Sequence, residues 1–244
     1  MVVQHVLRER SCQPCLGTRK LHHLLNKQTS LSFHVGRDRL FKILKEHRLL
    51  VQPKRAYHKT TNSHHRFRCH PNLLKPSEHQ VVPGGPGHVW VADITYLPVR
   101  QGEAYLSLVT DAYSRKIVGY HVHDNLKASS VVCAYQAALR SKTGKTGLIH
   151  HSDRGSQYCS ELHQKMHEKH GVICSMTDGY DCYQNAIAER VNGILKTEYL
   201  PARSDNIEQA RKLVDEAVKT YNTKRPHLAL KYKTPDEVHR AFLT

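Results

Sequence analysis

The sequence lacks any long apolar run. Across its 244 residues, no stretch approaches the run of about 18 apolar residues that a transmembrane helix needs. The first ten residues also lack the apolar segment of a secretory signal, so we expect no association with a membrane. Apolar side chains nevertheless make up 39% of the chain. That fraction is enough for a folded core, and it excludes wholesale disorder.

Cysteine is also sparse. The seven cysteines are odd in number and scattered, which argues against a disulfide framework and fits a reducing compartment. Cys12 and Cys15 form a C-x-x-C pair with His22 and His23 nearby, and such ligands can bind zinc. No second Cys or His pair follows at the distance found in zinc fingers. We therefore interpret these two thiols as unpaired.

Negative charge is the property in shortest supply. The chain has 21 Asp and Glu against 37 Lys and Arg, a formal net charge of +16. Such an excess is typical of proteins that bind a polyanion, most often nucleic acid. Residues 1–80 hold 16 of the basic residues and only 4 of the acidic ones. The sequence therefore predicts a basic N-terminal part before a nearly neutral body that holds most of the carboxylates.

The N-terminal part divides into a helical unit and a connector. Apolar side chains three and four residues apart predict one helix over residues 18–25 and another over 36–47. The second helix has a basic face that we predict to contact DNA, formed by Arg37, Arg39, Lys42 and Lys45. We therefore predict a basic helix-turn-helix-like DNA-binding unit over 1–51 and a basic, Pro- and Gly-rich linker over 52–87. A solvated helical hairpin that does not bind DNA remains the alternative for residues 1–51.

From residue 88 to 244 the pattern predicts an α/β domain. Five β-rich stretches alternate with helical ones in the order βββαβαβααα, and the first three strands form an antiparallel meander. The predicted strands are 88–99, 104–110, 116–123, 147–151 and 172–176. The predicted helices are 128–140, 156–170, 185–198, 207–221 and 234–242. Thr234, Pro235 and Glu237 form a capping box at the start of the last helix.

Three carboxylates stand at positions suited to metal chemistry. Asp93 lies within the apolar first strand, Asp153 directly follows the fourth strand, and Glu189 lies on a helix with 35 residues between it and Asp153. If the fold brings them together they repel one another, and Mg²⁺ or Mn²⁺ would relieve the repulsion. Two such ions can clamp the attacking and leaving oxygens of a phosphodiester. Spacing alone leaves open that these are ordinary acids.

Motifs around these acids resemble those of the DDE transposase and retroviral integrase superfamily, specifically the second reading-frame product of IS3-family insertion sequences. Asp93, Asp153 and Glu189 match its D, D, (35) E signature. The segment His151-Ser-Asp-Arg-Gly-Ser-Gln-Tyr158 is similar to the motif around its second Asp. Tyr221-Asn-Thr-Lys-Arg-Pro-His227 with Thr234-Pro235 resembles its C-terminal signature, and Gly17-Thr-Arg-Lys-Leu21 its helix-turn-helix segment.

The resemblance implies an RNase H-like mixed five-stranded sheet with flanking helices. It also implies DNA cleavage and strand transfer that depend on Mg²⁺ or Mn²⁺, with two ions bound by Asp93, Asp153 and Glu189. The expected partners are DNA, further copies of the chain, and an upstream DNA-binding reading frame that is fused to it or binds it. The expected location is cytoplasmic, on the nucleoid. One departure is Tyr183-Gln-Asn-Ala186, which lacks the Pro-x-Asp that often precedes the family's glutamate.

Residues near Glu189 extend the predicted site. Lys196 follows Glu189 by seven residues, nearly two helical turns, so both lie on one face and Lys196 can hold a phosphate. We also predict DNA contacts for Arg190 and Asn185. Glu198 points to the opposite side and is a poor metal ligand. Two alternatives for the function remain, a non-catalytic or decayed DNA-binding product of an element and an RNase H-type nuclease.

Overall fold

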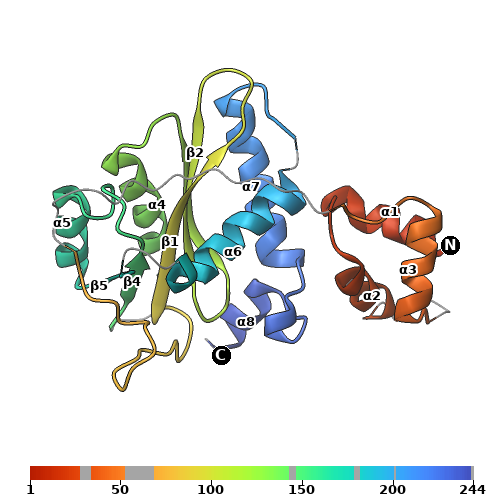
Figure 1. The fold of residues 1–244 in the computed structure, drawn as a ribbon, viewed down its shortest axis with the longest axis horizontal. Helices are drawn as coiled ribbons and strands as arrows, with labels where there is room; N and C mark the ends of the chain where they lie inside the picture. Colours follow the sequence, from red (N-terminus) through yellow and green to blue (C-terminus); the bar gives the residue numbers. More distant parts are fainter. Residues whose placement is uncertain (28–33, 53–68, 143–146, 179–181, 201, 243–244) are drawn as a thin grey trace.

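Three short helices form the N-terminal unit. The computed structural model describes residues 1–27, 34–52, 69–142, 147–178, 182–200 and 202–242 (Figure 1). Helices α2 (Thr18–Lys27) and α3 (Arg37–Glu46) confirm the two predicted helices, but α1 (Val2–Cys12) was not predicted. The β-branched Val2 and Val3 favour strands over helices, which hid the signal of α1. The three helices share one buried core, formed by Val6, Leu16, Leu21, Leu25, Val35, Leu40 and Leu44.

A mixed five-stranded sheet forms the centre of the α/β domain, as expected. Its strands are β1 (Val89–Leu97), β2 (Ala104–Asp111), β3 (Ile117–His123), β4 (Ile149–Ser152) and β5 (Ile173–Met176). The spatial order is β3-β2-β1-β4-β5. Strands β1, β2 and β3 form the predicted antiparallel meander, whereas β4 and β5 run parallel to β1. The first strand is therefore central and lies next to the fourth.

Helices cover both faces of the sheet. One face packs on α4 (Ala128–Arg140) and α5 (Glu161–His170), and the other on α6 (Ala186–Ile194) and α7 (Ile207–Lys224) (Figure 1). Helix α5 begins five residues later than predicted, because the Ser160 side chain caps it by accepting a hydrogen bond from the His163 backbone N–H. None of the described helices is long and apolar enough to cross a bilayer.

The predicted helix over 185–198 divides into two parts. After a 3₁₀ turn, η1 (Cys182–Asn185), α6 ends at Ile194 and a single π-helical turn, η2 (Leu195–Tyr199), continues it. Such turns are rare and occur most often at functional sites. The side chains after Ile194 therefore turn by a smaller angle per residue than an α-helix would give.

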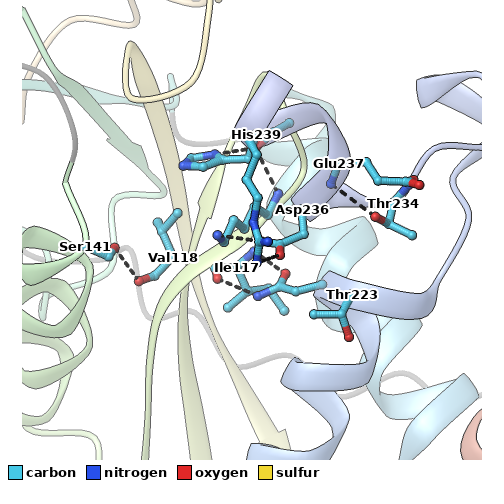
Figure 2. Close-up of polar contacts among 12 residues, drawn as sticks. Ile117, Val118, Ser141, Thr223, Thr234, Asp236, Glu237 and His239 are labelled. Carbon is cyan, nitrogen blue, oxygen red and sulfur yellow. Dashed lines mark hydrogen bonds and ion pairs between the residues drawn. The ribbon is translucent and has the colours of Figure 1, made fainter. Parts of the chain in front are cut away.

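The C-terminal helices close the edge of the sheet beside β3. The side chain of Asn222 on α7 pairs with the backbone N–H and C=O of Ile117, both at 2.9 Å. After a 3₁₀ turn, η3 (Leu228–Leu230), helix α8 (Pro235–Ala241) starts with the predicted capping box, in which the Thr234 and Glu237 side chains cap each other's backbone N–H (Figure 2). The capping box of the sequence is confirmed.

The described part of the predicted linker packs on the domain. Residues 69–88 form no helix or strand, but the Leu73 backbone N–H donates to Ser175 Oγ at 3.0 Å and the Gly87 N–H to Asp111 Oδ2 at 2.7 Å. The most basic part of the linker, residues 53–68, lies outside the described residues. Asp111 thereby ties the end of the linker to β2.

The N-terminal unit contacts the domain through a partly buried ion pair between Lys20 and Glu198. Glu198 on η2 accepts two hydrogen bonds from the buried Arg225, at 2.8 and 2.7 Å, and pairs with Lys20 on α2 at 3.3 Å. Burial alone would raise the pKa of Glu198, but hydrogen bonds and charge from Arg225 and Lys20 outweigh burial and lower it. Glu198 thus faces away from the predicted site, as expected.

Candidate active site

Strand register places Asp93 beside Asp153. Val91 on β1 pairs with His151 on β4 in a parallel ladder, and the same register continued by two residues brings Asp153 level with Asp93. Alternation along β1 sends Trp90, Ala92 and Ile94 toward α4 and α5. Asp93 therefore points to the opposite face, where α6 lies.

Helix α6 carries Glu189 to the same face. Ala188 packs with Val89 and Val91 of β1, which fixes the start of α6 over the sheet. One turn after Glu189, the buried Asn192 donates its amide to Asp93 Oδ2 at 2.8 Å. Residues three apart on a helix lie on one side, so Glu189 faces the Asp93 region although its side chain is exposed.

The pKa of Asp93 responds to the charges of both other carboxylates. Burial raises that pKa first, the charge of Asp153 raises it further, and Glu189 adds a smaller increase, to about 7 in total. Hydrogen bonds from Asn192 and from the Ile94 backbone N–H, at 2.8 and 2.9 Å, oppose the rise. The site is thus over-supplied with negative charge.

A lysine completes this face of the site. Lys196 Nζ lies 3.3 Å from Thr95 Oγ1 on β1, two residues beyond Asp93. Burial lowers the pKa of Lys196, and the charge of Asp93 opposes that change. The charge of Asp93 thus reaches Lys196, which places the two side chains near each other.

Backbone and side-chain contacts orient the loop that holds Asp153. Asp153 Oδ1 accepts the Gly155 backbone N–H at 3.0 Å, and Arg154 Nε donates to the Thr177 carbonyl at 2.6 Å. The buried His151 contacts both Ser175 Oγ at 2.8 Å and the Gln184 carbonyl at 3.1 Å. His151 thus joins the strand before Asp153 to the turn before α6.

A basic cleft lies between the N-terminal unit and the domain. Its volume is about 940 Å³, and its lining includes Arg37 and Arg190 of the predicted DNA-binding residues. Four more cations line it, Arg19, Lys20, Arg115 and Arg225, against one carboxylate, Asp38. The part of α6 that lines the cleft carries Ile187 and Arg190, a different stripe from that of Glu189 and Asn192.

The remaining predicted DNA contacts fall in two environments. Arg39, Lys42 and Lys45 are exposed on α3, where a phosphate backbone can reach them. Asn185 is buried, and its amide donates to the Ala92 carbonyl at 2.9 Å, which ties the start of α6 to β1. That position favours a role in holding α6 in place over direct contact with DNA.

Sequence reasoning missed Asn192 and Thr95. Asn192 lies three residues after Glu189, so the helical spacing that identified Lys196 also pointed to it. Thr95 lies two residues after Asp93, and the alternation of β1 placed both on one face. In the sequence, nothing distinguished Asn192 from an ordinary surface residue of the helix.

Comparison with known proteins identifies the family. Two models described as integrase core domain match residues 83–182 and 170–235. The chain is 39% identical over 216 residues to the uncharacterized 31 kDa protein of insertion element IS600 from Shigella sonnei, with 88% of this chain and 77% of that protein covered. It is 34% identical to the transposase of IS904 from Lactococcus lactis, with 64% and 62% covered. The chain belongs to the insertion-sequence transposases.

Further matches agree with the resemblance read from the motifs. This transposase is 32% identical to InsF of insertion sequence IS3A from Escherichia coli, with 64% of the chain and 53% of InsF covered. It thus spans less than two thirds of both the IS904 and the IS3A relatives. The HTLV-2 integrase catalytic core domain, solved in complex with magnesium in a trimeric form, superposes with a TM-score of 0.53 at 18% identity. That match covers 65% of this transposase and 99% of the viral domain, and it supports the RNase H-like fold.

Proposed function

We propose that this transposase cleaves and joins DNA strands with Asp93, Asp153 and Glu189 as its catalytic carboxylates. The observation that carries the proposal is the 2.8 Å hydrogen bond from Asn192, one turn after Glu189 on α6, to Asp93 Oδ2 on β1. The charges of Asp153 and Glu189 both raise the pKa of Asp93, in agreement with this placement. Acids that only covered the surface would gain nothing from such crowding, because like charges destabilise the fold. A bound cation would neutralise the repulsion between the carboxylates, so their crowding favours a metal-binding role.

The donor set fits a hard divalent cation. All three candidate ligands are carboxylates, the oxygen donors that Mg²⁺ and Mn²⁺ prefer. Mg²⁺ or Mn²⁺ at these residues, two ions by our prediction, would activate the attacking hydroxyl and neutralise charge on the leaving oxygen. We note that the HTLV-2 domain was solved with magnesium, although its low identity supports the fold alone.

The chain's own residues prepare the site for a phosphodiester. Asn192 and the Ile94 N–H hold the two oxygens of Asp93 in fixed directions, and the Gly155 N–H holds one oxygen of Asp153. Lys196, whose Nζ contacts Thr95 Oγ1, would donate to a non-bridging oxygen of the scissile phosphate.

The reaction follows in two displacements. In cleavage, a water oxygen bonds to phosphorus, the P–O3′ bond breaks, and the released strand carries a 3′-hydroxyl. In strand transfer, that hydroxyl oxygen bonds to a phosphorus of the target strand and displaces another 3′-oxygen. Neither displacement requires a covalent intermediate with the protein.

The basic surfaces supply the affinity for DNA. Arg39, Lys42 and Lys45 on α3 would contact phosphates, while Arg37 and Arg190 lie on the two sides of the basic cleft. One duplex could therefore contact both the N-terminal unit and the domain. We further propose that several copies act together on the DNA, with an upstream DNA-binding reading frame as fusion or partner.

The test is strand transfer with oligonucleotides that carry the element's own ends. We expect Asp153→Asn to abolish joining while DNA affinity stays within a few-fold of the wild type. Asp124→Asn, at an exposed carboxylate between β3 and α4, serves as the matched control and keeps wild-type joining. Joining by Asp153→Asn near the wild-type rate would refute the catalytic role.

Two results would support the alternatives. DNA binding with no cleavage at any Mg²⁺ or Mn²⁺ concentration would identify a non-catalytic DNA-binding protein. Cleavage of an RNA–DNA hybrid without joining of DNA ends would identify an RNase H-type nuclease. Each result would be read with Asp153→Asn as the background control.

A further inference from the structure

Three buried histidines meet on the face of the sheet opposite Asp93. His150 lies on β4, and His163 and His167 lie one turn apart on the inner side of α5. Their exposed fractions are 1%, 0% and 3%. One ring nitrogen from each histidine lies within 4.8 Å of those of the other two. Among the described residues, no other trio of His, Cys, Asp or Glu meets this condition.

The polar atoms of this cluster lack partners. Both ring nitrogens of His150, His163 and His167 are buried and make no hydrogen bond in the described part of the chain. The hydroxyls of Tyr135 and Tyr158, which border the cluster, are in the same condition. A buried polar group without a partner costs about 1–3 kcal/mol, so such a cluster calls for a ligand.

Simple packing explains the cluster poorly. The site is otherwise apolar and aromatic, and leucine or phenylalanine would fill it without polar atoms to satisfy. The i, i+4 spacing of His163 and His167 points both rings to one side of α5, where His150 meets them. Three inward imidazoles are instead the donor set of a transition metal.

The distances suit a tetrahedral ion after a small adjustment. Three imidazole nitrogens around Zn²⁺, with Zn–N of about 2.0–2.1 Å, lie about 3.4 Å apart. A separation of up to 4.8 Å requires each nitrogen to move inward by less than about 1 Å, which small ring rotations supply. A water would complete the tetrahedron in the fourth position.

The histidines are also in the right protonation state. Burial lowers the pKa of all three, to about 3 for His163 and about 4 for His167, and well below the ordinary value for His150, with neighbouring histidines lowering each further. Neutral imidazole offers a lone pair at neutral pH, which metal binding requires.

We propose that His150, His163 and His167 bind one Zn²⁺ ion that clamps α5 to β4. Residue 150 lies three positions before Asp153, and Tyr158, at the border of the cluster, is close enough for Asp93 and Asp153 to influence its pKa. The ion would therefore support β4, the strand that directly precedes Asp153, from the opposite face of the sheet. Its role is structural, it is separate from the carboxylate site, and it does not depend on the proposed catalysis.

Metal analysis of the full chain tests the proposal, with any purification tag of histidines removed. We expect one zinc per chain by mass spectrometry of the metals, and the visible absorption of tetrahedral Co²⁺ after exchange with cobalt. His163→Gln and His167→Gln should lose both signals. His170→Gln, at an exposed histidine on the same helix, should keep them, and so should Asp153→Asn.

Measurements on the wild type keep the test decisive if the variants fail to fold. Titration of the metal-free chain with Zn²⁺ against a coloured chelator should show a single site and a rise in melting temperature. A wild type that retains no stoichiometric metal and does not compete with the chelator would refute the proposal. Equal loss of zinc in His170→Gln and His163→Gln would refute it as well.

Discussion

Replacement of Asp93 by asparagine should stabilise the protein while it abolishes activity. The folded-state pKa of about 7, against an ordinary value of 3.8, means that the ionised carboxylate costs about 4 kcal/mol at pH 8. Asparagine removes this charge but accepts with only one oxygen. It therefore loses one of the bonds from Asn192 and Ile94, worth about 1 kcal/mol. The net gain at pH 8 is about 3 kcal/mol.

The sign of the effect depends on pH. A raised folded-state pKa means that the folded protein holds its proton where the unfolded chain has released it, so stability falls as pH rises from about 4 to about 7. Asp93→Asn lacks this decline. We expect the variant to be no more stable than the wild type at pH 4, and more stable by about 3 kcal/mol at pH 8.

Thermal and urea unfolding in buffer freed of divalent cations by a chelating resin measure this difference. For a chain of this size, about 3 kcal/mol corresponds to about 6–12 °C in melting temperature. Asp124→Asn provides the exposed control and should change neither value. Equal stability of Asp93→Asn and wild type at pH 8, or a gain that is the same at pH 4, would refute the crowding of the carboxylates.

Four further substitutions test how the domain is held together. Gly119→Ala would press its methyl group against the Ala134 carbonyl on α4 and should cost about 1–3 kcal/mol in urea unfolding, whereas Gly193→Ala, with open space on α6, should gain up to about 1 kcal/mol. Thr234→Ala removes the cap of α8 and should cost about 1 kcal/mol by the same measurement. Burial first, and then nearby cations, lower the pKa of His227 to about 3. The free energy of unfolding should therefore fall as pH drops below 6.5, because the unfolded chain binds a proton that the folded protein does not. The variant His227→Gln should avoid about 3 kcal/mol of that loss at pH 4. A wild type whose stability is flat between pH 6.5 and 4 would contradict this last expectation.

Patterns of local origin were readable in the sequence. The strands of the domain, the capping box at Thr234 and the end of the helix predicted over 156–170, which Gly171 follows, agree with alternation and end signals, and the structure confirms them. The left-handed backbone of Gly171, with φ of 59°, is the conformation that glycine adopts most readily. Such features need only a few neighbouring residues to be specified.

Features that depend on distant contacts were not readable. The π turn after Ile194 accompanies Glu198, which is held by Arg225 and Lys20 from two other parts of the chain. The meeting of His150 with His163 and His167 depends on how α5 lies against β4, which no spacing within α5 reveals. The meeting of the three acids is a prediction from the motif resemblance, since their spacing alone left it open.

The three carboxylates lie on parts of the fold that differ in rigidity. This difference explains why the repulsion between Asp93 and Asp153 persists in the folded protein. Asp93 lies within β1 and Asp153 directly follows β4, which pairs with β1, so their repulsion has little room to relax by movement of the backbone. Glu189 is exposed at the start of α6, whose position depends on His151 and Asn185 contacts to neighbouring segments. A cation that drew in Glu189 would offset the repulsion of the fixed pair and order α6 in one event. Addition of Mg²⁺ should therefore stabilise the wild type at pH 8 and leave Asp93→Asn almost unchanged, whereas equal stabilisation of the two proteins would place the ion elsewhere.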